Sequence, residues 1–216
     1  AYSPTAILGL GMSEVEFPRD WPQTFTMVGP VTGTPERVLP TAAPPPRLPR
    51  GPLVLITIGT HLHWARRDLI AQVAALASRV RSHTFVLTLG QVGASLPSDL
   101  PGSRVHIVDH MPYDEVLPAC DAVIHHGGAG ITYSAIRAGV PALVQPRDYD
   151  QFDFAARITA SGAGVRIRHP LGHPATAAAL TTLLRADRSR LQALTTAIRG
   201  YDPVAATAAI VNREIR

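Results

Sequence analysis

Lysine is absent from this 216-residue chain, and all 20 of its basic residues are arginines. The arginines are scattered, with no run longer than Arg66-Arg67, and aromatic residues make up only 6% of the sequence. A nucleic-acid groove needs basic side chains gathered on one face, with aromatic side chains among them. The net charge of +4 is not gathered in this way. We therefore exclude nucleic acid as a partner and attribute the arginine bias to genome composition.

Cysteine is nearly absent as well, since Cys120 is the single one. One cysteine cannot form an internal disulfide, and this usage is typical of a reducing compartment, so we expect the cytoplasm. Cys120 stands directly before an apolar run, and we interpret it as a small buried residue rather than a reactive thiol.

Long apolar runs are also lacking. None reaches the roughly 20 residues of a membrane-spanning helix, and no charged segment followed by an apolar one marks a signal peptide. With 46% hydrophobic residues, the chain can still bury a core of one or two globular domains. Because it begins with Ala1 rather than Met, we expect it to be a fragment of a longer protein.

From residue 51 onward, apolar runs alternate with helical patterns. Strands are predicted at residues 52–59, 84–89, 105–108, 122–124, 142–144 and 165–167. Helices are predicted at residues 64–80, 114–119, 131–138, 152–161, 174–184, 189–198 and 203–216. This alternation predicts an α/β fold, a doubly wound parallel sheet with right-handed crossovers. In the last helix, Val204, Ala208 and Val211 share one stripe.

The first 50 residues have a different character. Short strand-like runs occur at residues 5–10 and 25–28, and residues 35–52 hold seven prolines, which is typical of a semi-rigid extended linker. We therefore place a domain boundary near residue 50. We expect residues 1–50 to be the end of one domain plus this linker, and residues 51–216 to be a second domain.

A glycine-rich loop, His125-His126-Gly127-Gly128-Ala129-Gly130, lies between the predicted strand at 122–124 and the helix that follows. Free backbone N–H groups and the helix dipole favour an anion at such a helix start, and glycine lets the backbone approach it closely. His126 can add a hydrogen-bond donor. The loop therefore predicts a phosphate or diphosphate site, although it matches neither the dinucleotide nor the Walker pattern. The alternative is a tight turn that binds nothing.

A second polar loop, Pro146 to Gln151, follows the next strand. Loops at the carboxyl ends of neighbouring parallel strands face one crevice, which is where open α/β sheets bind ligands. Asp150 and Gln151 offer several acceptors and an amide donor, a combination that suits a polyhydroxylated group.

The order HHGGAG, GVPALVQP and DQ resembles the donor-binding signature of GT-B glycosyltransferases, especially the antibiotic and macrolide enzymes of the UDP-glucuronosyltransferase-like family. The resemblance covers most of residues 51–216 and implies a Rossmann-like C-terminal domain that binds a nucleotide sugar. It assigns the diphosphate to His126, Gly128, Ala129, Gly130 and Thr60. It assigns the sugar to Asp150 and Gln151. It assigns the nucleotide base and ribose to His110, Met111, Tyr113 and Ser134.

The reaction implied is transfer of a sugar from a nucleotide diphosphate sugar to an acceptor hydroxyl. In the family, an N-terminal domain binds the acceptor and supplies the histidine base, and this chain offers no candidate for that base. We therefore expect no turnover by the chain alone. Fixed amides can replace a cation at the diphosphate, so neither a metal nor another cofactor is expected. His61, His63, His125 and His126 lack a fourth-ligand pattern for zinc.

Three positions depart from the family. Ile131 stands where a Ser or Thr hydroxyl usually contacts phosphate, and Thr132 points about 100° away around the helix. Ser134 replaces a glutamate that grips the ribose in many members. The macrolide branch, which handles TDP-deoxysugars, has a small hydroxyl residue there, so a TDP-sugar is favoured over a UDP-sugar. Phe154 replaces an asparagine, and we interpret this change as packing.

Three alternatives remain open from the residues. One is a binding module that holds a nucleotide sugar without transfer, which Ile131 favours. Another is a different GT-B enzyme such as a nucleotide-sugar epimerase, for which Asp148 and Asp150 are the available acidic residues. The last is a structural α/β domain without a ligand.

Overall fold

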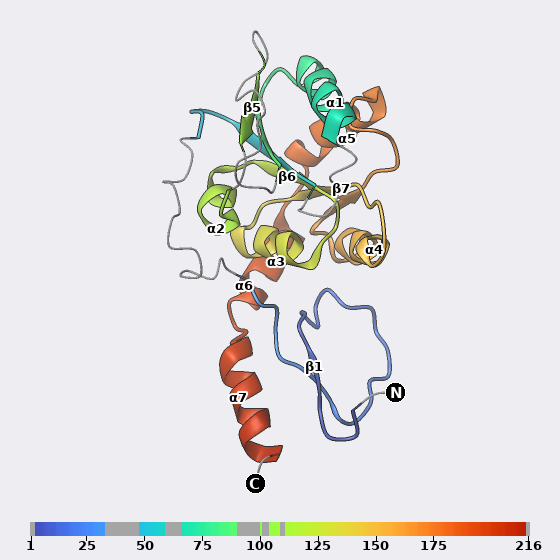
Figure 1. Cartoon of the computed structure of the whole chain (residues 1–216), viewed down its shortest axis with the longest axis vertical. Coiled ribbons are helices and arrows are strands. Elements are labelled where there is room, and N and C mark those ends of the chain that lie inside the picture. The colour runs from blue at the N-terminus through green and yellow to red at the C-terminus, as the bar shows by residue number, and fades with distance from the viewer. Residues whose placement is uncertain are drawn as a thin grey trace.

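A parallel β-sheet forms the centre of the computed structural model, which describes residues 3–32, 48–58, 66–89, 100, 104–108 and 111–214, without the side chains of residues 66 and 67. Within these ranges, six strands pair in the order β5-β4-β3-β6-β7-β8, and every pairing is parallel (Figure 1). The strands are β3 (Leu53–Thr57), β4 (Thr84–Thr88), β5 (Val105–Val108), β6 (Ala122–His125), β7 (Ala142–Val144) and β8 (Gly164–Arg166). The predicted fold class is confirmed.

All predicted helices are present, and their described bounds lie within two residues of the prediction. Their bounds are α1 (Arg66–Arg79), α2 (Tyr113–Val116) with a 3-10 turn at Leu117–Ala119, α3 (Ala129–Ala138), α4 (Gln151–Ser161), α5 (Pro174–Arg185), α6 (Ser189–Ile198) and α7 (Pro203–Glu214). Glycines in the left-handed conformation end α3 and α4, at Gly139 and Gly162. Glycine adopts this conformation without the steric penalty of a Cβ.

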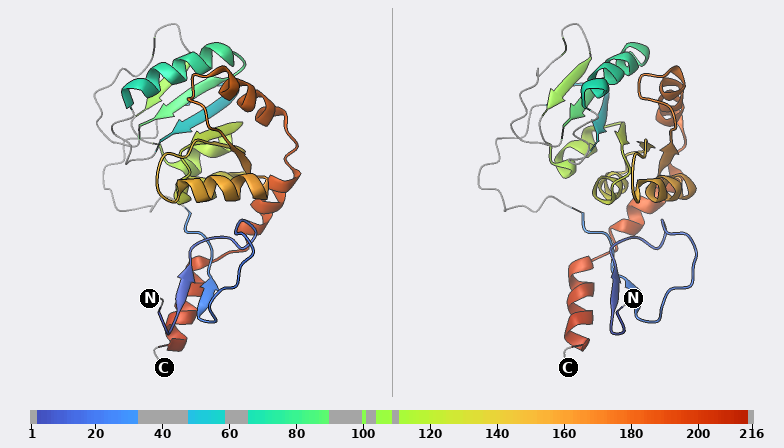
Figure 2. Two further views of the ribbon diagram at one scale, coloured as in Figure 1. Left: turned by 90° about the vertical axis from the view of Figure 1, so that its right-hand side faces the viewer. Right: turned by 45° about the vertical axis from the view of Figure 1, so that its right-hand side comes forward.

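The central strand shows why the sheet is covered on both faces. All residues of β3 are buried, and alternate side chains point to opposite faces. Leu53 and Leu55 join one apolar cluster, whereas Val54 and Ile56 join the other. Side chains of α1 and α5 fill the second cluster, and side chains of α3, α4 and α6 fill the first. The result is a three-layer arrangement (Figure 2).

The strand order reverses between β3 and β6, because the chain runs outward to β5 and then returns to the other side of β3. Ligands of doubly wound sheets bind beside such a switch point, at the carboxyl ends of the strands. Thr57 and His125 are paired in register at these two ends. The fold therefore puts the glycine-rich loop at the expected edge of the sheet.

Residues 3–32 form a separate small unit. Its strands β1 (Ile7–Gly9) and β2 (Phe25–Met27) make a two-stranded parallel sheet. Met12 and Val15, which lie between the two strands, are buried in the same apolar cluster as α3 and α4. Most of the predicted proline-rich linker lies at residues 33–47, outside the described residues, so the domain boundary near residue 50 stays a prediction.

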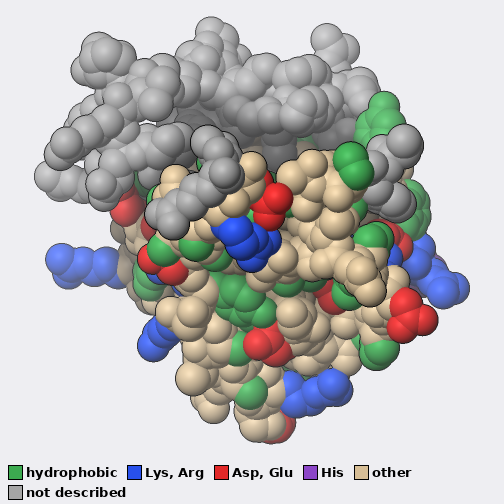
Figure 3. All heavy atoms as spheres, turned by 90° about the horizontal axis from the view of Figure 1, so that it is seen from below, with side chains coloured by type: hydrophobic (Ala, Val, Ile, Leu, Met, Phe, Trp, Pro, Cys, Tyr) green, Lys and Arg blue, Asp and Glu red, His purple; other side chains and the backbone are tan. Residues whose placement is uncertain are grey.

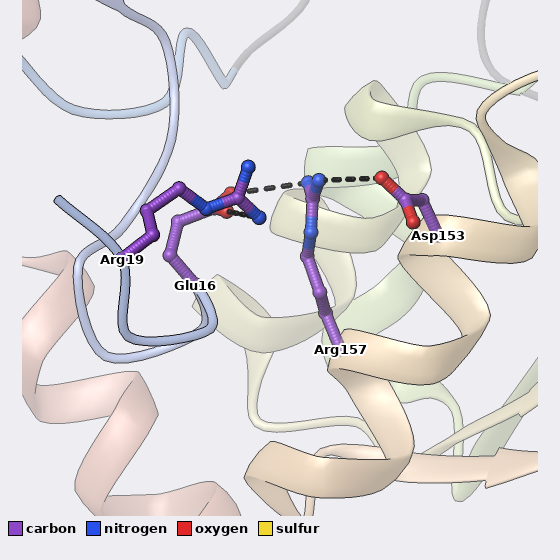
Figure 4. Close-up of polar contacts among 4 residues, drawn as sticks. All are labelled: Glu16, Arg19, Asp153 and Arg157. Atoms are coloured by element: carbon purple, nitrogen blue, oxygen red, sulfur yellow. Dashed lines mark hydrogen bonds and ion pairs between the residues drawn. The ribbon is translucent and has the colours of Figure 1, made fainter. Parts of the chain in front are cut away.

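An ion-pair network also joins this N-terminal unit to α4. The Arg157 guanidinium lies between the Glu16 carboxylate, at 3.0 Å, and the Asp153 carboxylate, at 2.9 Å (Figure 4). Arg19 approaches the same Glu16 at 3.7 Å. The side chains of Glu16 and Arg157 are only 11% and 14% exposed, so this link is largely shielded from water.

Helix α7 lies at the same end of the molecule as β1 and β2 (Figures 1 and 2). Val204, Ala208 and Val211, the predicted stripe, are all exposed, whereas Ile210 is buried. Figure 3 views this end and shows apolar side chains mixed with charged ones rather than gathered in one patch. None of the helices in the described ranges combines the length and apolarity that crossing a bilayer requires.

Cys120 is buried two residues before β6, which confirms the interpretation of it as a buried residue. Its thiol donates to the Val116 carbonyl oxygen at 3.3 Å. Burial, with the nearby Asp121 carboxylate, raises the pKa of this thiol to about 12, so it stays protonated near neutral pH.

Candidate functional site

Helix α3 begins at Ala129, two residues earlier than predicted. Gly128 is its N-cap residue and has no side chain to accept from the first amides of the helix. The first-turn amides have no carbonyl partner within the helix, and no acidic side chain lies in that turn. Ala129 and Gly130 are exposed. The helix start is thus built to attract an anion.

The imidazole of His126 lies against this helix start. A Cβ added at Gly128 would come within 2.7 Å of His126 Nε2, so only glycine allows this contact without a shift of the ring. A Cβ at Gly130 would meet nothing within 4 Å, which shows that the approach to the first turn is open there. The structure therefore places His126, Gly128, Ala129 and Gly130 at the open start of α3.

Gly127 connects this loop to the second polar loop. It has φ of +101°, and a Cβ there would lie 2.9 Å from the backbone oxygen of Gln151. Conformation and space both require glycine. The loop after β6 and the start of α4 are consequently in contact, and the two predicted ligand-binding loops meet at one place.

Gln151 has a structural role that sequence reasoning missed. Its Oε1 accepts from the backbone N–H groups of Arg147 and Asp148, at 2.9 and 3.1 Å, and so shapes the loop before α4. The side-chain NH₂ of Gln151 is the part that can donate to a ligand hydroxyl. Asp150 is exposed beside it. No local motif signals such a link, because it depends on the turn between β7 and α4.

The residues assigned to base and ribose are more deeply placed. The Met111 side chain is buried in the apolar core, so only its backbone can face a ligand. The Tyr113 hydroxyl shares a hydrogen bond of 3.0 Å with Thr57 Oγ1 at the end of β3. Burial raises the pKa of this tyrosine, although the bond to Thr57 opposes the shift. Ser134 is buried one helical turn after Gly130. Thr60 and His110 lie outside the described residues.

The departures from the family pattern are visible in α3 and α4. Ile131 is buried in the core cluster, so it offers a ligand only its amide. Thr132 is buried too, and its Oγ1 has no hydrogen-bond partner within the described ranges. Phe154 makes an edge-to-face contact with Tyr133, with 6.0 Å between ring centroids, which agrees with its interpretation as a packing residue.

Metal binding finds no support in the part of the chain that the structure describes. No group of three or more His, Cys, Asp or Glu residues there is arranged to hold an ion. His61 and His63 fall outside the described residues. The expectation that no metal is needed stays a prediction.

Comparison with known proteins agrees with the resemblance. Residues 69–200 match the family described as "Erythromycin biosynthesis protein CIII-like, C-terminal domain". L-demethylnoviosyl transferase of Streptomyces niveus is 34% identical over 169 residues, which are 72% of this chain and 39% of that protein. Elloramycin glycosyltransferase ElmGT of Streptomyces olivaceus is 37% identical over 142 residues, 65% of this chain and 34% of that protein.

A solved structure shows the same fold. Spinosyn rhamnosyltransferase SpnG superposes with a TM-score of 0.76 at 24% identity, over 98% of this chain and 57% of that one. SpnG has also been solved with thymidine diphosphate and with the spinosyn aglycone. The chain thus spans less than two thirds of the length of these proteins. It belongs to the family of erythromycin biosynthesis protein CIII-like C-terminal domains.

Proposed function

We propose that this chain is the donor-binding part of a glycosyltransferase that moves a sugar from a nucleotide diphosphate sugar to the hydroxyl of a natural-product-like acceptor. One observation carries the proposal. At the switch point of the sheet, the glycine-rich loop after β6 places the His126 imidazole against the start of α3, which has no side-chain cap. Through Gly127, the same loop also contacts the backbone of Gln151. An anion-binding helix start and a polar group for hydroxyls are the two features that a nucleotide sugar requires.

In this proposal, the departing diphosphate is stabilised by fixed donors. These are His126, the amides of Gly128, Ala129 and Gly130, and Thr60. Donors that are already oriented stabilise developing charge without reorganisation, so neither a metal nor another cofactor takes part. The base that deprotonates the acceptor comes from an acceptor-binding domain. The enzyme works in the cytoplasm without a nucleic-acid partner.

The other parts of the nucleotide sugar, namely the sugar, the base and the ribose, have their own contacts. Asp150 and Gln151 bind the sugar hydroxyls. The base and ribose are held by His110, Met111, Tyr113 and Ser134. A TDP-sugar is favoured over a UDP-sugar because Ser134 resembles the TDP-using macrolide branch. The complex of SpnG with thymidine diphosphate supports this choice.

Calorimetric titration with TDP and with UDP, each with and without Mg²⁺, tests the proposal. We expect TDP to bind more tightly than UDP, independently of Mg²⁺, and His126→Ala to weaken binding by about tenfold, which corresponds to one hydrogen bond of roughly 1.4 kcal/mol. The control is His83→Ala. His83 lies just before β4, at the amino ends of the strands, whereas the proposed site lies at their carboxyl ends. Equal binding of TDP and UDP would refute the TDP preference. No binding at millimolar nucleotide would refute the donor site.

Turnover provides a separate test. The chain incubated with a TDP-sugar and a phenolic acceptor is expected to yield no glycoside by mass spectrometry. A product that disappears with His126→Ala would show that this chain contains its own base.

A further inference from the structure

His125, the neighbour of His126, is held inside the protein. Its side chain is 2% exposed, and its Nδ1 accepts a hydrogen bond of 3.0 Å from the backbone N–H of Gly127. A ring nitrogen that accepts carries no proton, so the neutral imidazole has its hydrogen on Nε2. Within the described ranges, Nε2 is buried without a hydrogen-bond partner. The two histidines therefore differ in environment although they are adjacent in sequence.

The backbone of His125 is fixed by the sheet. It is paired with Thr57 of β3 and Val144 of β7, and its carbonyl oxygen accepts from Gln145 N–H at 2.9 Å. The hydrogen bond from the Gly127 N–H to the His125 side chain also holds Gly127 in place, two residues past the end of the strand. The first residue of the glycine-rich loop is thus tied to the central strands through its backbone and to Gly127 through its side chain.

The bond acts where the loop changes direction. Gly127 has φ of +101° and lies against the backbone of Gln151. Because its N–H is turned inward to His125, it is not a ligand donor, and the donors that remain follow it at Gly128, Ala129 and Gly130. The direction of those amides depends on how Gly127 is held.

The charge state of His125 suits this role. Burial, together with the neighbouring His126, lowers the pKa of His125 to about 3. The ring is therefore neutral near pH 7, and Nδ1 remains free of a proton and able to accept.

We propose that His125 is a positioning residue of the donor site: through Nδ1 it holds the Gly127 amide and thereby sets the direction of the amides at Gly128, Ala129 and Gly130, without touching the ligand. For the identity of the ligand, the inference rests on the proposed function. His126 contacts the diphosphate, and His125 acts through the loop.

Two substitutions of His125 separate positioning from simple core filling. In His125→Asn, the amide oxygen stands close to the position of Nδ1 and can accept from Gly127. In His125→Gln, the amide group reaches the position of Nε2 and leaves the Gly127 N–H without its acceptor. We expect TDP to bind His125→Asn within about threefold of the unmodified chain and His125→Gln at least about tenfold more weakly, a difference of roughly 1.4 kcal/mol. Circular dichroism checks that each variant is folded.

Nuclear magnetic resonance of the unmodified chain provides a measurement that needs no variant and no ligand. The ¹⁵N shifts of the His125 ring are expected to show the Nε2–H tautomer at pH 7, and the Gly127 amide is expected to exchange slowly with solvent. An Nδ1–H tautomer, or fast exchange of the Gly127 amide, would overturn the proposal.

The outcomes also separate this inference from the proposed function. If the unmodified chain binds TDP but the Asn and Gln variants bind it equally well, the positioning role is refuted and the donor site stands. If the unmodified chain does not bind TDP, the donor site is refuted. In that case, the tautomer of the His125 ring and the exchange rate of the Gly127 amide alone show whether His125 holds the loop.

Discussion

The six-stranded sheet and the small N-terminal sheet are held in different ways. Every residue of β3 is buried, and its four apolar side chains pack into clusters on both faces, whereas no residue of β1 or β2 is fully buried. The N-terminal unit inserts Met12 and Val15 into the core. Within the described ranges, hydrogen bonds and ion pairs also attach it.

The polar attachments depend on the direction of specific side chains, such as the Arg137 guanidinium that donates to Thr32 Oγ1 at 2.8 Å. Besides the Glu16–Arg157 pair, the Tyr201 hydroxyl donates to the Glu14 carboxylate at 2.9 Å and accepts from the Ser13 N–H at 3.1 Å. The difference indicates that apolar burial stabilises the larger sheet, while specific side-chain pairs hold the N-terminal unit on it. We therefore expect that detaching the N-terminal unit costs less free energy than unfolding the larger sheet.

Leu55→Ala is expected to have the largest effect, because it removes a completely buried side chain from the central strand. Truncations of this kind destabilise by about 3 kcal/mol through lost burial and the cavity left behind. Urea unfolding followed by circular dichroism measures the loss. Val165→Ala on β8, where the side chain is 41% exposed, is the control and should lose less than about 1 kcal/mol. Equal losses of unfolding free energy in the two variants would contradict the view that apolar burial around β3 stabilises the larger sheet.

Arg157→Met is expected to lower the free energy of unfolding by about 2 kcal/mol, since it leaves the shielded Glu16 carboxylate without its closest partner. The N-terminal unit should loosen first, which limited proteolysis detects as early cleavage between residues 3 and 32. Asp153→Asn is the matched control. The Asp153 side chain is 66% exposed, so this change should alter stability by less than about 0.5 kcal/mol. Proteolysis unchanged by Arg157→Met would show that Met12 and Val15 hold the unit alone.

Acidification is expected to weaken the larger sheet through His125. The unfolded state binds a proton near pH 6.5, whereas the folded state resists it until about pH 3, so the unfolded state binds more protons between these values. Stability contributed by the neutral ring is complete above pH 6.5 and is lost as the pH falls toward 3. The steepest loss is about 1.4 kcal/mol per pH unit. Between pH 6.5 and 5 we expect a loss of about 1.5 kcal/mol relative to His125→Asn. Parallel stability curves for the two proteins would contradict this.

Val204→Ser on α7 is expected to have the smallest effect, within about 0.5 kcal/mol, because the Val204 side chain is 77% exposed. Ile210→Ser on the same helix, where the side chain is 8% exposed, provides the contrast and should cost more than 1 kcal/mol, on the order of a buried apolar residue replaced by a polar one. Thermal unfolding of both variants makes the comparison. A larger loss from Val204→Ser would show that its stripe is covered in solution.

The sequence predicted the larger sheet well because its signals are local. Apolar runs ended by glycine or proline mark the strands, and the loops after β6 and β7 meet because parallel strands end at one edge. The helix start was misplaced by two residues, since Gly128 gives no side-chain cap signal. Contacts between distant residues were not predictable. Nothing in the sequence pairs Glu16 with Arg157, or Thr57 with Tyr113, because charge and polarity do not specify a partner.

The histidine pair shows the same limit within the site. The structure buries His125 and leaves His126 partly exposed, but the sequence could not show which hydrogen bond the buried histidine makes. That bond depends on the conformation of Gly127, which the glycine residue permits and does not dictate. Thr60 and His110 lie outside the described residues, so their roles stay predictions.

Alkylation of the buried Cys120 thiol can report how often the core of the folded chain opens. Because Cys120 is the single cysteine, and because its thiol is protonated and shielded in the folded state, an alkylating reagent can modify the protein only in molecules whose core has opened. Each modification adds one fixed mass increment. The rate at which that increment accumulates therefore measures how often the core opens around Cys120, two residues before the strand β6 that ends at His125.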